Sequence, residues 1–444
     1  MRRLAGGVLA CLLSALSAPG LAQESAPSIE PSPRPDETPG TRAHEWRQLR
    51  ERRFATIEPY RPGFLERQIL AFEKAERPSI LYLNFAGLYP RFQSIAQGSR
   101  TAAGLRFWQP DIGGSRLDAH ASAFYSIHGY EYYDVQFGRL PHTGKQFPLR
   151  SSQGLEVYEL GNMPPAQRAA LILYGAARYQ HYTRIGYYGP GPDSRREDET
   201  TFLDQRAFYE LVAGLQLSPH FSLTARGGYV QAFVGPGEDD DVPTTQELFT
   251  DEQAPGLDEQ PDFLLVSGQA FWDRRDKPGN PHNGVMAALQ ISHLDDRGGE
   301  EFGFTRFAGD VRGFVPLGSV QRTLALRGYL SSDNADSGGR VPFYAQQTLG
   351  GSHTLRGFPN FRFRDTKVFL LQAEYRWEAS PAIELALFAD AGRVAPRIAD
   401  VFSNLELDAG AGLRLKTNLN TVFRVDVARS REGWHGLARF SQGF

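Results

Sequence analysis

The chain has 444 residues, and its 48 Lys and Arg against 51 Asp and Glu give a net charge of −3, too near neutral to indicate nucleic-acid binding. Its one cysteine, Cys11, excludes a disulfide framework. Aromatic residues at 12% and 46 glycines, without a later apolar run of about eighteen residues, favour many short strands over spanning helices.

The amino terminus has the features of a secretory signal peptide. Arg2 and Arg3 precede an apolar run over residues 4–16, and small residues then predict cleavage of residues 1–22. A lipoprotein signal ending at Cys11 is the alternative, but the apolar stretch continues past that cysteine. An exported chain with an all-β pattern and no spanning helix is expected in the bacterial outer membrane.

Residues 23–78 form a second region, which opens with a linker rich in Pro, Ser and Glu. Two short helices are predicted over 41–54 and 63–76, and the second has its apolar residues on one face. We expect this face to pack on the periplasmic rim of a barrel; a plug or a partner-docking helix is the alternative.

From residue 79 to 444 the pattern consists of strands of roughly ten residues, the length that a tilted strand needs to cross a bilayer. We count sixteen, an even number as in single-chain bacterial barrels, and predict an all-β, sixteen-stranded antiparallel transmembrane barrel. The predicted strands are 81–94, 101–110, 117–128, 130–138, 169–181, 202–217, 220–234, 261–273, 284–295, 302–316, 321–332, 366–378, 382–393, 405–416, 420–430 and 434–444.

Connection lengths agree with this count when both chain ends are periplasmic. The connections after the sixth, tenth, twelfth and fourteenth strands are short, as periplasmic turns should be. Those after the fifth, seventh, eleventh and thirteenth run long, as external loops can. Residues 139–168 do not fit, because they would make a long periplasmic connection. A large soluble β-sandwich or propeller is the alternative, but its strands would usually have about five residues.

The longest connection lies between Leu330 and Thr366. A loop of about thirty residues inside a compact fold is uncommon and is usually functional or disordered. It has few charges and carries a glycine pair, so we predict that it folds back into the barrel. Its tip is the motif Leu355, Arg356, Gly357 and Phe358.

Two further Arg-Gly-aromatic stretches, at Arg312 and Arg327, lie inside alternating strand patterns, and we interpret both as ordinary lumen-facing arginines. Arg356 needs an acceptor, because a guanidinium inside a barrel is costly unless a carboxylate pairs with it. By strand parity, Asp390 and Glu374 face the lumen. We hypothesise that Arg356 pairs with both and pins the loop; solvated lumen charges are the alternative.

These motifs resemble the BamA/TamA family of bacterial surface antigen barrels, which assemble or translocate outer-membrane polypeptides. The family has sixteen strands, a long sixth external loop ending in an Arg-Gly-aromatic tip, and a Phe-x-Asp-x-Gly strand that accepts the arginine. Phe388, Asp390 and Gly392 match that strand, Gly392 leaving room for a loop backbone. Glu374 stands where the family carries a second acidic partner.

The carboxyl terminus ends in Phe444, with Phe440 four residues before it. This resembles the signal by which barrel substrates are recognised for assembly; an ordinary last strand with a girdle aromatic explains it equally well. The resemblance implies partners: outer-membrane lipids including lipopolysaccharide, unfolded polypeptide clients, and the barrel-assembly machinery for the chain's own insertion.

One departure is that residues 23–79 are too few for the periplasmic POTRA modules, so the chain resembles family variants without them. The implied function is insertion or translocation of polypeptides, or lipids, at the outer membrane; a passive pore or structural barrel is the alternative. Gly87 and Pro90 in the first strand suggest a weakly bonded seam that opens laterally. We find no catalytic motif and predict no enzyme, cofactor or metal site.

Overall fold

The computed structural model describes residue 48 and residues 87–140, 171–277, 280–299, 301–319, 321–416 and 421–439. The chain divides into two units, Met1–Arg67 and Gln68–Phe444, and every element below belongs to the second. The expected signal peptide and most of the region expected to hold short helices lie outside the described residues, as do Phe440 and Phe444.

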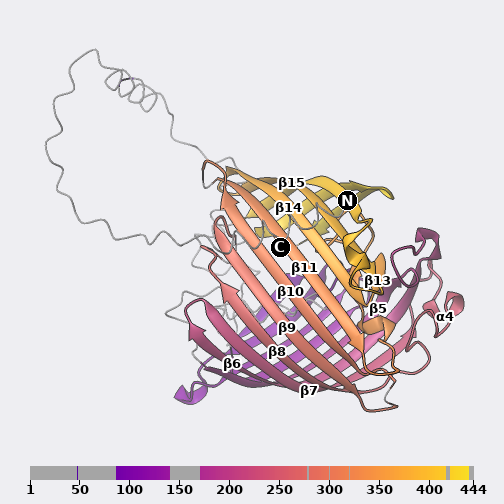
Figure 1. Cartoon of the computed structure of the whole chain (residues 1–444). Helices are drawn as coiled ribbons and strands as arrows, with labels where there is room; N and C mark the ends of the chain where they lie inside the picture. The colour runs from indigo at the N-terminus through magenta and orange to yellow at the C-terminus, as the bar shows by residue number, and fades with distance from the viewer. Residues whose placement is uncertain are drawn as a thin grey trace. The chain divides into compact units, whose positions relative to one another are not determined.

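The second unit is a single sheet of sixteen antiparallel strands in chain order, which forms the wall of a barrel (Figure 1). The predicted all-β fold and strand number are confirmed, and each predicted strand overlaps one observed strand. The strands are β1 (Leu88–Gln93), β2 (Ala102–Gln109), β3 (Asp118–Ser126), β4 (Glu131–Arg139), β5 (Leu171–Tyr187), β6 (Thr200–Ser218), β7 (Phe221–Pro236), β8 (Phe263–Asp273), β9 (Gly284–Asp296), β10 (Phe304–Pro316), β11 (Arg322–Ala335), β14 (Lys367–Ser380), β15 (Ile383–Ala395), β16 (Glu406–Lys416), β17 (Thr421–Ser430) and β18 (Gly433–Arg439).

Side chains alternate between the two faces in strands such as β3, β8 and β15, as a barrel wall in lipid requires. In β15, Leu387 is 60% exposed on the outer face, whereas Glu384 and Asp390 are buried on the lumen side. Apolar residues therefore face the lipid, and charged residues face one another inside. Within the described residues, no helix is long and apolar enough to cross a membrane.

β5 extends six residues beyond its predicted end at residue 181. In this extension Tyr182, Ile185 and Tyr187 are all buried, so the alternation of faces is lost, and the pairing with β6 shifts register there. The cause is packing: these side chains join an apolar cluster with the external loops. The long connection expected after β4 falls on residues 141–170, outside the described residues.

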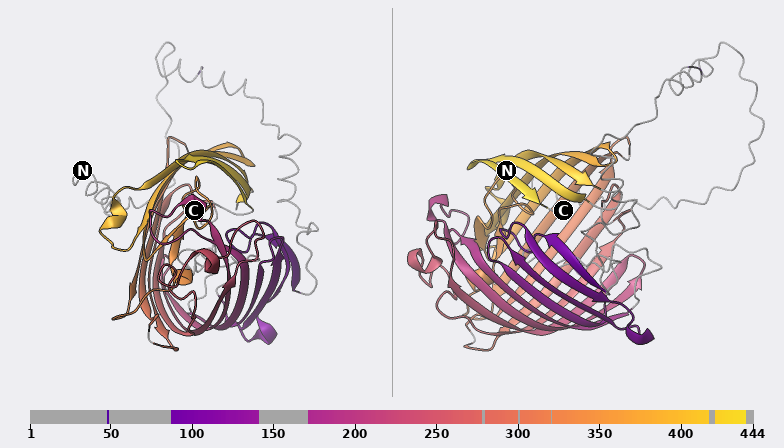
Figure 2. Two further views of the ribbon diagram at one scale, coloured as in Figure 1. Left: turned by 90° about the vertical axis from the view of Figure 1, so that its right-hand side faces the viewer. Right: turned by 180° about the vertical axis from the view of Figure 1, so that it is seen from behind.

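β1 and β18 are the two edges of the sheet, seen in indigo and yellow in Figure 2. Among the described residues, no backbone pairing joins β1 to β18. Within the described residues, these two strands have six and seven residues. Pro90 in β1 lies opposite Leu105 of β2, and as a proline it has no N–H to donate to a neighbouring strand.

The connection between β11 and β14 is the predicted long loop, and it returns into the lumen. Its short strands β12 (Gln347–Leu349) and β13 (Phe363–Asp365) pair with each other, so the segment between them leaves and returns at the same place. The remaining short elements are η2 (Ile112–Gly114), η4 (Arg196–Asp198), α4 (Thr245–Leu248), η5 (Phe343–Ala345) and η6 (Asp400–Phe402).

Candidate functional site

The guanidinium of Arg356, at the tip of the long loop, lies between two carboxylates of the barrel wall. Its Nε and Nη2 donate to Asp390 Oδ2 and Oδ1, both at 2.7 Å, and its Nη1 donates to Glu374 Oε2 at 2.7 Å. The backbone N–H of Arg356 also donates to Asp390, at 3.3 Å. All three side chains are buried. The structure thus brings the three predicted residues together in a bidentate arrangement.

Phe388 lies beneath the same guanidinium, with its ring centroid 3.5 Å from the Arg356 Cζ. Gly410, on the neighbouring strand β16, makes room for that ring, because a Cβ there would lie 2.5 Å from Phe388 Cζ. The aromatic ring adds a cation–π contact in a dry environment, where such contacts are strongest. The Phe-x-Asp pattern of β15 therefore supplies both the platform and the acid.

Glu374 is shared among several cations. Arg376 Nε donates to it at 2.6 Å, and Arg414 Nη2 lies 2.5 Å from its other oxygen. Arg414 also reaches Glu384, with Nη1 to Oε1 at 2.9 Å. Buried charges are tolerated when they are paired and hydrogen-bonded. Here the loop arginine joins a network of charged side chains that belong to the barrel wall.

Gly357 lies where no side chain would fit. A Cβ there would be 2.5 Å from Asp408 Cβ and 3.1 Å from Ser430 Cβ. Ser430 Oγ donates to the Gly357 carbonyl at 2.7 Å. The loop tip is therefore seated directly on the side chains of two wall strands.

Phe358 and Leu355 anchor the apolar side of the tip. Both are fully buried, and Phe358 contacts Phe363 edge-on with ring centroids 5.2 Å apart. Leu349 of the loop lies over Gly392, where a Cβ would come within 3.0 Å of its Cδ1. The absence of a side chain at Gly392 thus gives room to a loop side chain, whereas the sequence predicted room for the loop backbone.

The glycine pair of the loop adopts a conformation that suits glycine, with φ of 112° at Gly350 and 90° at Gly351. The Gly351 N–H lies 3.0 Å from the Leu355 carbonyl and 3.1 Å from the Phe358 carbonyl. A Cβ on Gly351 would lie 2.2 Å from Gln97 Nε2. The pair therefore allows a tight turn against the barrel wall.

Several residues outside the predicted site also hold the loop. Arg327 Nη1 donates to the His353 carbonyl at 3.0 Å while its other nitrogens bind Asp310, so treating it as an ordinary lumen arginine was incomplete. Arg312 binds Asp310 and fits that interpretation. The other loop contacts are Gln97 to the Gly350 carbonyl at 2.6 Å, Gln372 to the Thr354 carbonyl at 2.7 Å, Arg424 to the Ser352 carbonyl, and Arg439 to Ser352 Oγ.

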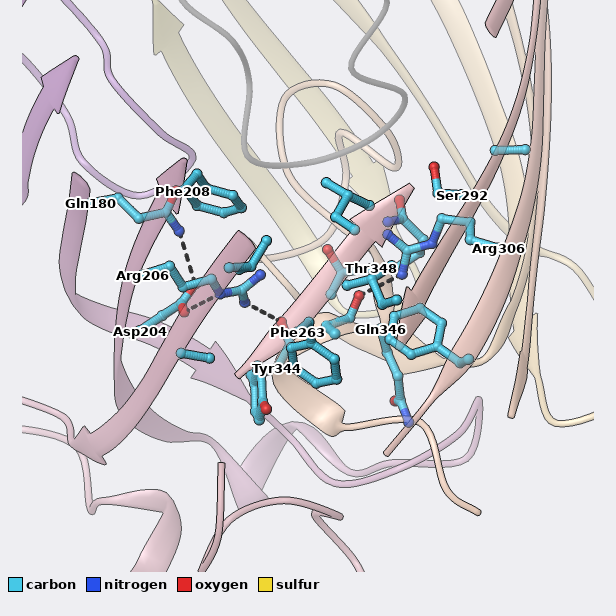
Figure 3. A pocket seen from close by; sticks show the side chains of 18 of the residues that line it. Gln180, Asp204, Arg206, Phe208, Phe263, Ser292, Arg306, Tyr344, Gln346 and Thr348 are labelled. Carbon is cyan, nitrogen blue, oxygen red and sulfur yellow. Dashed lines mark hydrogen bonds and ion pairs between the residues drawn. The ribbon is translucent and has the colours of Figure 1, made fainter. Parts of the chain in front are cut away.

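A second set of contacts holds the loop at η5, where three successive carbonyls accept from three guanidinium groups. Arg364 Nη1 donates to Phe343 O at 2.7 Å, and Arg206 and Arg306 donate to the carbonyls of Tyr344 and Ala345, each at 2.6 Å. Figure 3 shows Arg206 and Arg306 reaching the segment from two sides.

On the external side, Arg362 connects three loops. Its Nε donates to Glu432 Oε1 at 2.9 Å, in the turn between β17 and β18. Its Nη1 and Nη2 donate to Ser194 Oγ at 2.8 Å and Ser194 O at 2.7 Å, in the connection between β5 and β6. We call Arg362, Glu432 and Ser194 the external clasp.

The contacts of the site hold the long loop against the barrel wall. Within the described part of the chain, no group of three or more His, Cys, Asp or Glu is arranged to hold a metal ion. The four acidic residues Glu238–Asp241 lie in the loop after β7, where Arg184 pairs with Asp239 at 3.3 Å.

Comparison with known proteins gives a family and a fold. The model of the Omp85 superfamily domain matches residues 87–433, and no curated protein sequence matches. The structure of Haemophilus ducreyi BamA lacking POTRA domains 1–3 is 13% identical with a TM-score of 0.55, over 79% of this chain and 68% of that one. CdiB from Acinetobacter baumannii is 12% identical (TM-score 0.42; 76% and 55% covered), and CdiB from Escherichia coli is 11% identical (0.48; 80% and 62%).

The chain thus spans less than two thirds of either CdiB chain, and at these identities the BamA likeness concerns the fold. The family match covers most of the chain, from the start of β1 to the last hairpin, and therefore shows the family as well as the fold. The predicted resemblance is confirmed: this chain belongs to the Omp85 superfamily and forms a BamA/TamA-like barrel of the outer membrane.

Proposed function

We propose that this barrel inserts or translocates polypeptides at the outer membrane, and that clients leave through the seam between β1 and β18. Membership of the Omp85 superfamily supports the general role. The observation that carries the proposal is the seam itself, whose strands have no backbone pairing with each other in the described residues.

The long loop bridges this seam from inside. Gln97, just after β1, donates to the carbonyl of Gly350, and Arg439 of β18 donates to Ser352 Oγ two residues further along the loop. Two side-chain contacts are easier to exchange than a ladder of backbone hydrogen bonds. We infer that the seam opens when these contacts are released, while the rest of the loop stays in place.

The role we propose for Arg356 is to keep the loop in place during opening. Its partners Asp390 and Glu374 lie on β15 and β14, away from both edges. A loop fixed there can lose its contacts at Gln97 and Arg439 without leaving the lumen. The proposed partners are unfolded polypeptide clients, outer-membrane lipids including lipopolysaccharide, and the machinery that inserts the barrel itself.

The test is to join the two edges covalently. Phe92 of β1 and Trp434 of β18 are outward-facing, and Cys11 is the only native cysteine, so a Phe92→Cys/Trp434→Cys pair in a Cys11→Ser background is unambiguous. The pair is linked with a flexible bis-maleimide, the protein is placed in liposomes, and folding of an unfolded barrel client is followed by heat-modifiable gel mobility.

We expect the linked protein to lose most of its insertion activity, while each single-cysteine variant treated with the same reagent keeps it. Unchanged activity in the linked protein would rule out exit through the seam. Activity absent from the unlinked protein as well would contradict the insertion function itself.

A further inference from the structure

A cavity of about 160 Å³ lies in the lumen between the wall strands β5–β11 and the loop segment that follows η5 (Figure 3). It is bordered by aromatic rings, by amide and hydroxyl groups, and by an excess of cationic side chains. Among the described residues that border it, the charged ones are one acid, Asp204, and the cations Arg178, Arg206, Arg226, Arg306 and Arg364.

Three of these arginines have carboxylate partners in the wall. Arg206 pairs with Asp204 at 2.7 Å, Arg226 with Glu210 at 3.0 Å, and Arg306 with Asp333 at 2.6 Å. These three guanidinium groups are therefore neutralised by the wall, and the question that remains is how the charge of Arg364 is compensated.

Arg178 stacks on the Phe208 ring, with Cζ 3.9 Å from the centroid. Arg364 is 3% exposed and, among the described residues, forms no ion pair, its polar contacts there being to carbonyl oxygens. Its Nη1 donates to the Phe343 carbonyl, its Nη2 is 3.5 Å from the Gly186 carbonyl, and its Nε has no hydrogen-bond partner in the described part of the chain.

A buried guanidinium in this condition is costly, because carbonyl oxygens replace only part of the water and counter-charge that it has lost. Burial lowers the pKa of Arg364 to about 10, so the group is still a cation at neutral pH. The other buried loop arginines differ, since Arg356 and Arg362 each have a carboxylate. Among these three loop arginines, Arg364 is therefore the one to which an anionic ligand could supply the carboxylate-like partner that it lacks in the described residues.

We propose that this cavity binds a small organic oxyanion, a carboxylate or a phosphate monoester, whose oxygens accept hydrogen bonds from Arg364. A planar guanidinium matches the oxygens of either group better than it matches carbonyls. The rings of Phe208, Phe263 and Phe304 line the same space and suit an apolar body. An engineered cavity of about 150 Å³ holds benzene, so the site suits a ligand of roughly that size.

A simpler explanation is that the arginines only hold the carbonyls of η5. It accounts for Arg206 and Arg306, which have their own carboxylates and use a remaining nitrogen on the loop. It does not account for Arg364, which lies near aromatic rings and carbonyls but forms no ion pair in the described residues, and whose Nε has no hydrogen-bond partner there. A bound oxyanion would supply both a counter-charge and a hydrogen-bond acceptor to Arg364.

The experiment uses the full chain in detergent and two probes, sodium benzoate and inorganic phosphate, at constant ionic strength set with sodium chloride. Binding is followed by calorimetry and by the temperature at which the barrel loses its compact gel mobility. We expect saturable one-site binding of at least one probe. Tighter benzoate binding identifies a carboxylate on an apolar body, and tighter phosphate binding identifies a phosphate ester; no saturation with either overturns the proposal.

Two variants of opposite design make the test specific. Arg364→Gln should lower the affinity for the probe by about tenfold or more. This is the loss expected when a charged hydrogen bond worth about 1.4 kcal/mol or more is removed. The matched control is Arg312→Gln, a lumen arginine outside the cavity, which should bind as the native protein does. Equal binding by Arg364→Gln and the native protein overturns the proposal.

Thr348→Glu places a carboxylate within the cavity lining and should imitate the ligand. We expect this variant to lose its response to both probes and to keep its compact mobility at a higher temperature. It also serves if Arg364→Gln fails to fold. A Thr348→Glu protein that still binds the probe, or that melts at a lower temperature, contradicts the assignment.

Discussion

Arg356 is the residue whose removal the wall should tolerate least. In Arg356→Ala, Asp390 loses its bidentate partner and becomes a buried, unpaired charge, whereas Glu374 keeps Arg376 and Arg414. Breaking one side of a buried pair costs about 3–5 kcal/mol. We expect chymotrypsin to cut the long loop of this variant in folded protein that resists it otherwise, and the unfolding free energy to fall by that amount.

A matched arginine and a second substitution separate this effect from loss of charge in general. Arg312→Ala should leave the loop resistant, because Asp310 keeps Arg327. Adding Asp390→Asn to Arg356→Ala removes the stranded charge and should restore part of the stability. An unchanged digestion pattern in Arg356→Ala would show that the pairing does not hold the loop.

Gly357 offers a test of fit that leaves every charge in place. A Cβ at Gly357 would clash with Asp408 and displace the tip, whereas a Cβ at Gly313, the glycine of a similar Arg-Gly-Phe stretch in β10, meets nothing within 4 Å. We expect Gly357→Ala to destabilise the barrel by about 1–3 kcal/mol, as overpacking does, and Gly313→Ala to have little effect. Chemical unfolding of both proteins in parallel measures the difference. Equal unfolding free energies would mean that the tip has room to move.

The central residues of the site could be predicted from sequence because their chemistry restricts their partners. A lumen arginine needs a carboxylate, and strand parity left few candidates besides Asp390 and Glu374. Gln97, Arg327 and Arg424 could not be predicted in the same way, because they donate to backbone carbonyls, and every residue of the loop offers one. Finding them requires the path of the loop, which the sequence pattern does not determine.

At the scale of elements, the strands of the barrel were predictable because lipid imposes one rule on all of them. A strand that alternates apolar and polar residues over about ten positions has few other stable environments. The extension of β5 was not predictable, because beyond the membrane its burial depends on external loops. There tertiary packing replaces alternation, and Tyr182, Ile185 and Tyr187 lose the period of two.

The external clasp should couple two loops that are far apart in the sequence. In Glu432→Ala, Arg362 keeps its bonds to Ser194 but is left buried without its carboxylate, at a cost of about 1–3 kcal/mol. We expect amide exchange to rise together in the turn after β17 and in the loop after β5. The control is Glu406→Ala, which removes the partner of the exposed Arg431. This variant should leave amide exchange in the loop after β5 unchanged. Exchange that rises on one side alone would contradict the coupling.

At the scale of the whole molecule, the long loop connects the two edges of the sheet, which have no backbone pairing with each other in the described residues. It touches the chain just after β1 through Gln97 and touches β18 through Arg439, while Arg356 fixes it to β14 and β15. The clasp then ties its far end to the last hairpin. In the proposed mechanism, this arrangement keeps the loop in the lumen while β1 and β18 separate.

Electrical conductance tests this arrangement as a whole. Barrels of 16–18 strands with an empty lumen leave an aqueous channel, but here loop side chains occupy the lumen, so we expect small and flickering currents in planar bilayers. Replacing residues 343–361 with a short Gly-Ser linker should raise the conductance by about threefold or more and make it steady, as expected for an open channel of this strand number. Shortening the external acidic segment Glu238–Asp241 is the control and should change little. Large, steady currents from the unaltered protein would favour a passive pore, and they would mean that the loop does not close the barrel.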